Sequence, residues 1–333
     1  HNFLWINTLD IKTSKIATHN IIENWIENND IFNQQTWKLD ILSKRIISWL
    51  SNTNLTLEVS NLSYKNKFNL SIVKQANHLF KNISKEKNYE KQLIGCAALI
   101  LIGLIFKEYE KSKITGFEIL KKIIKINFDY DGFPKSRNPQ EINENLKYFI
   151  LIREWFKESQ ITVPEYIEEN IYYLGQGYSF VWQSTGFDFL FNGNNNSKNI
   201  DFDNYLKRLG YKFKNENWDF GGYIILKNKK ICLMMDVGSS PNSKYSDDYQ
   251  AGALSFEILS NGEKLISNCG YYKKKNSKLN KISKSSAAQS TLIIDDNSSC
   301  KFKKINNEWL IKKGVKILKK NIIFEKNYWK ISA

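Results

Sequence analysis

The hydrophobic periodicity of the chain changes once, near residue 195, and this change limits what the chain can fold into. Before that point apolar residues recur at helical spacing, as Ile21, Ile22, Trp25 and Ile26 do. Helices are predicted at residues 17–29, 40–50, 66–83, 88–107, 115–127, 139–158 and 164–183. The loops between them are short, so successive helices should pair in antiparallel fashion.

Beyond the polar stretch FNGNNNSKNIDFDN, the pattern shifts to period two and short apolar runs. GGYIILKNKKICLMMDVG predicts a hairpin around Asn228, and ALSFEILSNGEKLISNCG predicts another with Asn261-Gly262 as its turn. YQAGALSFEI, LISNCGYY and SSAAQSTL should each be a strand, so that residues 251–259, 263–269 and 289–295 pair in antiparallel fashion. We expect about nine strands in total. The last strand runs to Ala333 with no end signal, which suggests that the native chain continues.

Length and composition favour two domains and a polyanionic partner. The 333 residues suffice for two domains, which we place at residues 1–195 and 196–333. The net charge of +15 suits an acidic polymer or surface, although the excess of Lys, Asn and Ile also reflects AT-rich codon usage. No arginine cluster, zinc-finger spacing or RNP-like strand supports nucleic-acid binding. The apolar run LIGCAALILIGLIF is shorter than the roughly 20 residues of a transmembrane helix.

The four cysteines are scattered and form no CxxC pair, so the sequence predicts neither a disulfide framework nor a cysteine zinc site. Cys96 lies in the apolar run and should be a buried small residue. His19 and His78 lie in predicted helices and are expected to pack there rather than to catalyse.

Several motifs, in this order along the chain, carry a family resemblance: DGFPKSRNP, LFNGNNN, QAGALSFEI, ISNCGYY and SSAAQSTLIIDD. Together they resemble the heparinase II/III family of polysaccharide lyases. The resemblance implies an α+β multidomain fold, in which an incomplete α/α toroid precedes an antiparallel β-sandwich. It also implies an acidic, uronate-containing polysaccharide as partner and a bacterial protein of the cell envelope or periplasm. Nothing in the sequence indicates the oligomeric state.

The family cleaves its glycans by β-elimination, which needs a base for the C5 proton, a group that neutralises the carboxylate, and an acid for the leaving oxygen. This chain departs from the family pattern. Gln250 and Gln289 stand where the family commonly has His, Asn268 lies between them, and Pro134 replaces another His. Because amide oxygens are weak zinc ligands, we expect no metal and no other cofactor. The three amides should nevertheless lie together on one cleft.

The remaining candidates come from the motifs. Tyr249 and Tyr178 are predicted as base and acid if their pKa values are depressed, with packing roles as the alternative. Arg137 is the predicted carboxylate clamp, in a loop with no expected packing duty. Expected glycan contacts are Asn138, Gln250, Asn268, Gln289, Lys135 and Trp5. Lys135 is expected in solvent, Trp5 is as readily a core residue, and Asn138 equally predicts a helix N-cap before Pro139.

Two function classes follow. The first is a polysaccharide lyase that cleaves an acidic glycan by β-elimination. The alternative is a catalytically degenerate relative that binds an anionic cell-surface polysaccharide without cleaving it. A nucleic-acid-binding protein is a third class, supported by charge alone.

Overall fold

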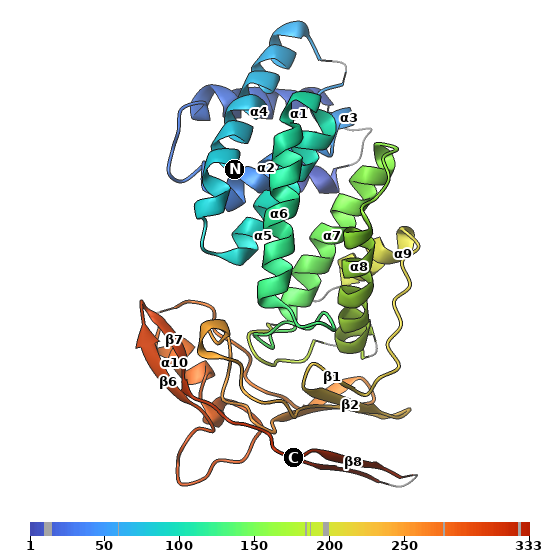
Figure 1. Cartoon of the computed structure of the whole chain (residues 1–333), viewed down its shortest axis with the longest axis vertical. Helices are drawn as coiled ribbons and strands as arrows, with labels where there is room; N and C mark the ends of the chain where they lie inside the picture. Colours follow the sequence, from blue (N-terminus) through green and yellow to red (C-terminus); the bar gives the residue numbers. More distant parts are fainter. Residues whose placement is uncertain are drawn as a thin grey trace. The chain divides into compact units, whose positions relative to one another are not determined.

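A computed structural model describes residues 1–9, 15–58, 60–183, 185–186, 188–195, 200–275, 277–325 and 328–333. A helical N-terminal part is followed by antiparallel β-sheet, as predicted (Figure 1). By internal contacts the chain divides into two compact units, residues 1–126 with 148–167, and residues 127–147 with 168–333. We call them the helical unit and the sheet unit. The predicted boundary at residue 195 stays a prediction, since residues 196–199 of that junction lie outside the described residues.

The helices expected from the periodicity are present, and the short helices α3, α9 and α10 occur in addition. They are α1 (Lys15–Asn29), α2 (Leu39–Leu50), α3 (Thr53–Thr56), α4 (Leu62–Asn82), α5 (Tyr89–Ile105), α6 (Glu110–Asn127), α7 (Gln140–Glu158), α8 (Glu165–Tyr178), α9 (Ile200–Arg208) and α10 (Lys278–Ser283). A π-helical turn, Ser179–Gln183, continues α8. Short 3₁₀ turns cover Leu4–Thr8, Ile83–Lys85, Lys107–Tyr109, Ser243–Tyr245 and Ser286–Ala288.

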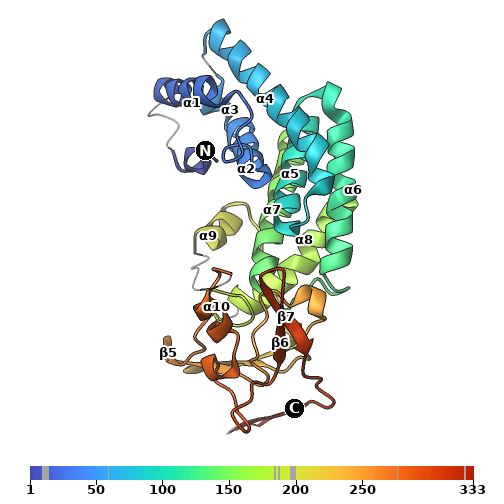
Figure 2. The same ribbon diagram turned by 90° about the vertical axis from the view of Figure 1, so that its left-hand side faces the viewer.

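Helix α5 forms the centre of the helical unit. Its residues from Leu93 to Gly103 are buried, and it packs against α2 and α4 (Figures 1 and 2). The side chain of Asn88 caps its start by accepting a hydrogen bond from the backbone N–H of Lys91. Cys96 is fully buried in α5, which confirms its predicted role. Within the described ranges, no helix is both long and apolar enough to cross a membrane.

The sheet unit contains three antiparallel sheets. The largest has the order β1-β2-β3-β4-β5, and β6–β7 and β8–β9 are separate hairpins. The strands are β1 (Asp219–Phe220), β2 (Tyr223–Lys227), β3 (Ile231–Asp236), β4 (Phe256–Ser260), β5 (Glu263–Ile266), β6 (Lys301–Ile305), β7 (Glu308–Lys313), β8 (Asn321–Phe324) and β9 (Trp329–Ser332). Every pairing is antiparallel, as predicted.

Two apolar clusters hold these sheets. Ile224, Leu226 and Val237 are buried beneath Ile322 and Ile331 of the β8–β9 hairpin. The second cluster consists of Tyr249, Ala251, Cys300 and Ile311, with Phe302 of β6 packed against it. The loop after β3 and the β6–β7 hairpin are therefore joined through buried side chains.

Both predicted hairpins form. Strands β2 and β3 are joined at Asn228, and β4 and β5 are joined by Asn261-Gly262. Both residues of the second turn have positive φ, 51° and 85°, as a two-residue hairpin turn requires.

Replacing Gly262 by alanine is expected to lower the free energy of unfolding of the sheet unit by about 1–2 kcal/mol, because a Cβ is strained at positive φ. Glu263→Ala, at the exposed next position, should change it by less than about 0.5 kcal/mol. Urea unfolding of both variants measures the difference. Equal stability of the two would contradict the turn assignment.

The three stretches predicted as strands around the amides are largely not strands. In YQAGALSFEI the strand starts only at Phe256, and in LISNCGYY it ends at Ile266. SSAAQSTL contains a 3₁₀ turn, and residues 289–295 contribute only an isolated bridge at Ile294. The physical reason is that short polar side chains bond the backbone there: Ser286 Oγ donates to the Ala251 carbonyl.

Candidate functional site

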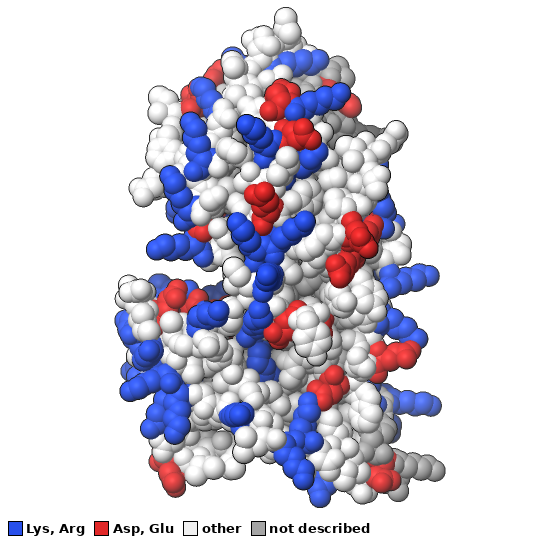
Figure 3. Space-filling view, in the orientation of Figure 1, with Lys and Arg blue, Asp and Glu red and all other residues white. Residues whose placement is uncertain are grey.

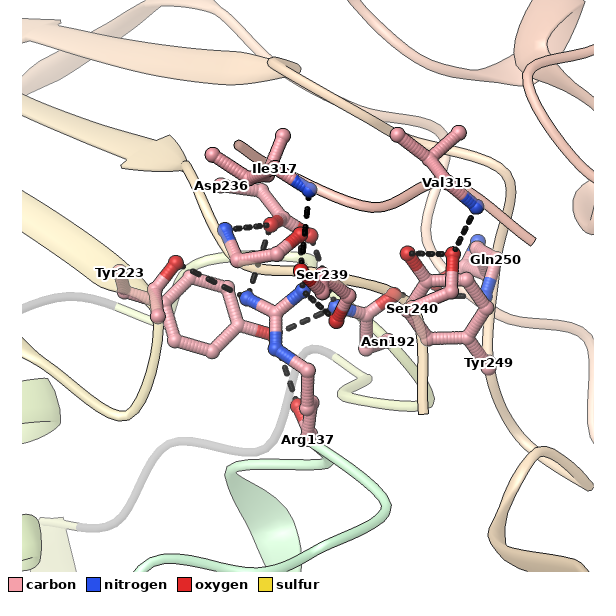
Figure 4. Close-up of polar contacts among 12 residues, drawn as sticks. Arg137, Asn192, Tyr223, Asp236, Ser239, Ser240, Tyr249, Gln250, Val315 and Ile317 are labelled. Carbon is pink, nitrogen blue, oxygen red and sulfur yellow. Dashed lines mark hydrogen bonds and ion pairs between the residues drawn. The ribbon is translucent and has the colours of Figure 1, made fainter. Parts of the chain in front are cut away.

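The predicted clamp Arg137 lies at the centre of a buried polar network in the sheet unit (Figure 4). Its Nη2 lies 2.8 Å from Oδ1 of Asp236, and Nη2 also donates to the Gly222 carbonyl at 2.9 Å. Its Nη1 donates to the Gly238 carbonyl at 3.1 Å, and the guanidinium lies 4.7 Å from the ring centroid of Tyr223. Arg137 is 7% exposed, so the expectation that it has no packing duty is wrong.

The charge of Arg137 is stabilised within the protein. Burial alone would lower its pKa, but the neighbouring Asp236 carboxylate raises the pKa above its ordinary value. Asp236 is fully engaged as well: Oδ1 accepts from the Gly238 N–H at 3.1 Å, and Oδ2 accepts from Asn192 Nδ2 at 3.0 Å. Loss of either partner of this buried pair would leave the other charge uncompensated in the interior, so the role of Arg137 here is structural.

Tyr223 and Asn192 complete this network. The Tyr223 hydroxyl donates to the Arg137 carbonyl at 2.7 Å and accepts from Asn192 Nδ2. The Asn192 side-chain oxygen accepts from the backbone N–H of Gln250 at 3.3 Å. The segment at Asn192, the loop at Arg137 and the stretch at Gln250 therefore meet at one point, as Figure 4 shows.

The two predicted proton-transfer tyrosines are buried. Tyr249 is 1% exposed, and its hydroxyl accepts from Ser240 Oγ at 3.3 Å. Burial raises the pKa of Tyr249, the Asp236 carboxylate raises it further, and Arg137 opposes both. Tyr178 is fully buried, donates to Asp203 Oδ1 at 2.8 Å, and has a pKa raised by burial. The depressed pKa that a proton-transfer role requires is therefore not found at either tyrosine, and burial agrees with the alternative of packing.

The three amides lie near one another through neighbouring backbone partners, but none of them lies in a strand, and their opening on one cleft stays a prediction. Gln250 Nε2 donates to the carbonyls of Ser283 at 2.7 Å and Gly270 at 3.0 Å. Gln289 Nε2 donates to the same Ser283 carbonyl at 3.0 Å. The Asn268 side-chain oxygen accepts from the backbone N–H of Ser290, next to Gln289, at 2.8 Å. Both glutamines thus present N–H groups to a shared backbone oxygen.

This arrangement does not fit the zinc ion that the family resemblance suggests. The amide nitrogens point at carbonyl oxygens, and a carboxamide nitrogen has no lone pair to offer a metal. Among the described residues, no group of three His, Cys, Asp or Glu side chains could hold a metal ion. The three histidines of the chain, His1, His19 and His78, lie in the helical unit.

Packing explains His19 and His78, as predicted. His19 stacks on Tyr64 with ring centroids 4.6 Å apart, and His78 lies 5.4 Å from the rings of both Phe32 and Trp37. Burial lowers the pKa of both imidazoles below the ordinary value, because it disfavours their charged form.

The remaining predicted glycan contacts are divided between the two units. Asn138 is buried, accepts from the Gln140 N–H at 3.0 Å and donates to Asp248 at 3.2 Å, so it caps the start of α7 as predicted. Lys135 is half-buried rather than fully in solvent. Trp5 belongs to the helical unit, is 40% exposed and lies 6.1 Å from the Phe3 ring. Contact of these residues with a glycan stays a prediction.

Sequence reasoning missed the buried acids of this region. Asp236 ends the apolar run ICLMM, and Glu257 occupies a buried position of β4 between the apolar residues Phe256 and Ile258. Glu257 is fully buried and accepts from the Asn268 N–H at 2.7 Å. A carboxylate within an apolar strand signals a buried partner, and that signal was present in the sequence.

Comparison with known proteins finds a family match for part of the chain and several solved structures of similar fold. Residues 216–333 match the family described as heparinase II/III-like, C-terminal. The fold is similar to a heparan sulfate lyase mutant from Pedobacter heparinus, with a TM-score of 0.66, 15% identity, and coverage of 86% of this chain and 52% of that one. It is also similar to heparinase III, with a TM-score of 0.65, 18% identity, and coverage of 86% and 52%.

The wild-type Pedobacter heparinus lyase gives a TM-score of 0.64 at 15% identity over 93% of this chain and 55% of that one. This chain therefore spans about half the length of the solved structures that it resembles. None of the curated proteins matches it.

Proposed function

We propose that this chain, whose residues 216–333 match the heparinase II/III-like C-terminal family, binds an acidic, uronate-containing polysaccharide without cleaving it. One observation carries the non-cleaving part of this proposal. The groups predicted to perform β-elimination are buried and bonded within the protein: Arg137 to Asp236, Tyr249 to Ser240 and Tyr178 to Asp203. A base must reach the proton that it removes, and these groups face protein partners instead.

The ionisation of these groups supports the same proposal. Elimination requires one group that changes protonation state near its working pH. Burial raises the pKa of both Tyr249 and Tyr178, which keeps the two phenols protonated and unable to act as bases. The amides at Gln250, Asn268 and Gln289 do not titrate at all.

Charge supports an acidic ligand. The chain carries a net charge of +15, and Figure 3 shows Lys and Arg side chains spread over one face, with a group over the β6–β7 hairpin. The exposed lysines of that hairpin are Lys301, Lys303, Lys304, Lys312 and Lys313. An anionic polysaccharide of the cell envelope would be attracted to such a surface.

β-Elimination is the second candidate function, and the similarity of the fold to heparan sulfate lyases favours it. The two candidates differ in their product. Only elimination creates a carbon–carbon double bond between C4 and C5 of the sugar, which absorbs in the ultraviolet.

The test incubates the protein with a heparan sulfate tetrasaccharide and with an unsulfated glucuronate-containing tetrasaccharide, and uses a neutral dextran fragment as the control. We expect calorimetry to show binding of an acidic probe that weakens as salt screens the charges, with no rise in ultraviolet absorbance. A rise in absorbance would establish the lyase instead. Absence of binding to both acidic probes would overturn the proposal.

A further inference from the structure

A pocket of about 150 Å³ lies beside the β6–β7 hairpin, away from the Arg137 network. The residues that line it are Lys281, Lys284, Ser285, Ser298, Phe302 and Trp309. Helix α10 supplies Lys281, β6 supplies Phe302 and β7 supplies Trp309. None of the predicted site residues lines this pocket.

The strand register fixes which side chains share the pocket face. Lys304 pairs directly with Trp309, and Phe302 pairs with Ile311. Directly opposite residues in an antiparallel pair point to the same side, and so do residues two apart along a strand. Lys304, which is exposed, therefore lies beside Trp309 on the same face as Phe302.

One wall of the pocket is held rigidly by Lys284, which is 2% exposed. Its ammonium donates to the carbonyls of Trp309 at 3.0 Å, Tyr249 at 3.2 Å, Ser246 at 3.3 Å and Asp247. These bonds use the three protons of Lys284 on the backbone. They connect the backbone of Trp309 to the loop at residues 246–249, which holds in place the strand that carries the indole.

The other polar groups of the pocket are available to a ligand. Lys281 is exposed, its Nζ lies 5.2 Å from the Trp309 ring centroid, and it makes no ion pair within the described part of the chain. The Ser298 hydroxyl accepts from the Ser286 N–H at 3.1 Å, which leaves its proton free to donate. Among the described residues, the indole N–H of Trp309 has no acceptor.

From this combination we propose that the pocket binds one anionic sugar unit of an acidic polysaccharide. The aromatic face of Trp309 stacks against the sugar ring, and the carboxylate or sulfate of the unit meets Lys281 and the Ser298 hydroxyl. Lys304, beside Trp309, attracts the neighbouring unit. This inference rests on the proposed function and assigns it a subsite.

Single-stranded nucleic acid also uses lysines with aromatic stacking, but it is bound along grooves that follow several nucleotides. The small size of the pocket, about 150 Å³, and the scarcity of arginine favour a single sugar unit. The test therefore also compares the binding of a single-stranded oligonucleotide with that of the acidic tetrasaccharides.

The test titrates the heparan sulfate tetrasaccharide and the unsulfated glucuronate tetrasaccharide into the wild-type chain and its variants, with calorimetry as the readout. Lys281→Gln should weaken binding about tenfold, the size of one charge-assisted hydrogen bond. Lys278→Gln is the matched control, since it removes the same charge from the same helix outside the pocket, and it should change affinity less than about twofold.

Trp309→Ala should weaken binding more than Trp309→Phe, which keeps an aromatic face, and circular dichroism checks that both variants fold. A larger loss for the sulfated probe identifies sulfate as the anion, and equal losses identify the carboxylate. If the wild type binds an acidic probe and Lys281→Gln and Trp309→Ala bind it equally well, the pocket is wrong and the proposed function stands. If the wild type binds neither probe, the pocket assignment and the proposed function are both wrong. Tighter binding of an oligonucleotide, lost in Lys281→Gln, would overturn the ligand class.

Discussion

Replacing Arg137 by alanine is expected to lower the free energy of unfolding of the sheet unit by about 3–5 kcal/mol, because removal of one partner leaves the other charge buried and unpaired. The orphaned partner is Asp236, which is 1% exposed. The Gly238 carbonyl also loses the donor that Arg137 provides, and the Gly222 carbonyl keeps the Val237 N–H but loses the guanidinium. Urea unfolding followed by circular dichroism measures the loss.

A matched control and a rescue sharpen this experiment. Arg208 is exposed and its guanidinium lies over the Tyr205 ring, so Arg208→Ala should cost less than about 1 kcal/mol. The double variant Arg137→Met/Asp236→Leu should recover part of the loss, because it removes both buried charges together. An Arg137→Ala chain that unfolds like wild type but binds the tetrasaccharides more weakly would show instead that Arg137 is the glycan clamp that its loop predicts.

The sequence predicted most of the fold because its signals are local. Helical periodicity identified α1, α2 and α4 to α8, and the dipeptide Asn261-Gly262 identified the β4–β5 hairpin. The strand predictions around Gln250 and Gln289 were wrong for a different physical reason. There, hydroxyl and amide side chains satisfy the backbone groups that a sheet ladder would otherwise pair, and an alternating pattern does not reveal this competition.

The sequence predicted that several of these residues lie near one another, but it did not predict which side chains pair with which. Gln250 and Gln289 were expected to lie together and do so at the Ser283 carbonyl. Arg137 was expected to face a ligand, because a loop arginine shows no packing pattern of its own. Its partner Asp236 is distant in sequence, and only the folded chain brings the two together. Pairings of this kind depend on tertiary contacts that periodicity does not encode.

The second large loss of stability is expected on replacement of Gln250, because its side chain makes three buried hydrogen bonds. Its Nε2 donates to the carbonyls of Gly270 and Ser283, and its Oε1 accepts from the Gly193 N–H at 3.3 Å. Replacing it by leucine keeps the approximate volume but leaves the Gly270 carbonyl and the Gly193 N–H without these partners in the interior, while the Ser283 carbonyl keeps only its bond from Gln289. We expect Gln250→Leu to lower the free energy of unfolding of the sheet unit by about 3 kcal/mol.

Gln289→Leu is the matched control for that variant. Gln289 is half-buried and donates a single bond, to the Ser283 carbonyl that Gln250 also serves, so its loss should cost about 1 kcal/mol or less. Urea unfolding of the two variants and of the double variant measures the order of the effects. The double variant should lose more than the sum of the single losses, because only then does the Ser283 carbonyl lose both donors. Equal effects of the two single variants would contradict the network and would instead favour two interchangeable amides at a surface.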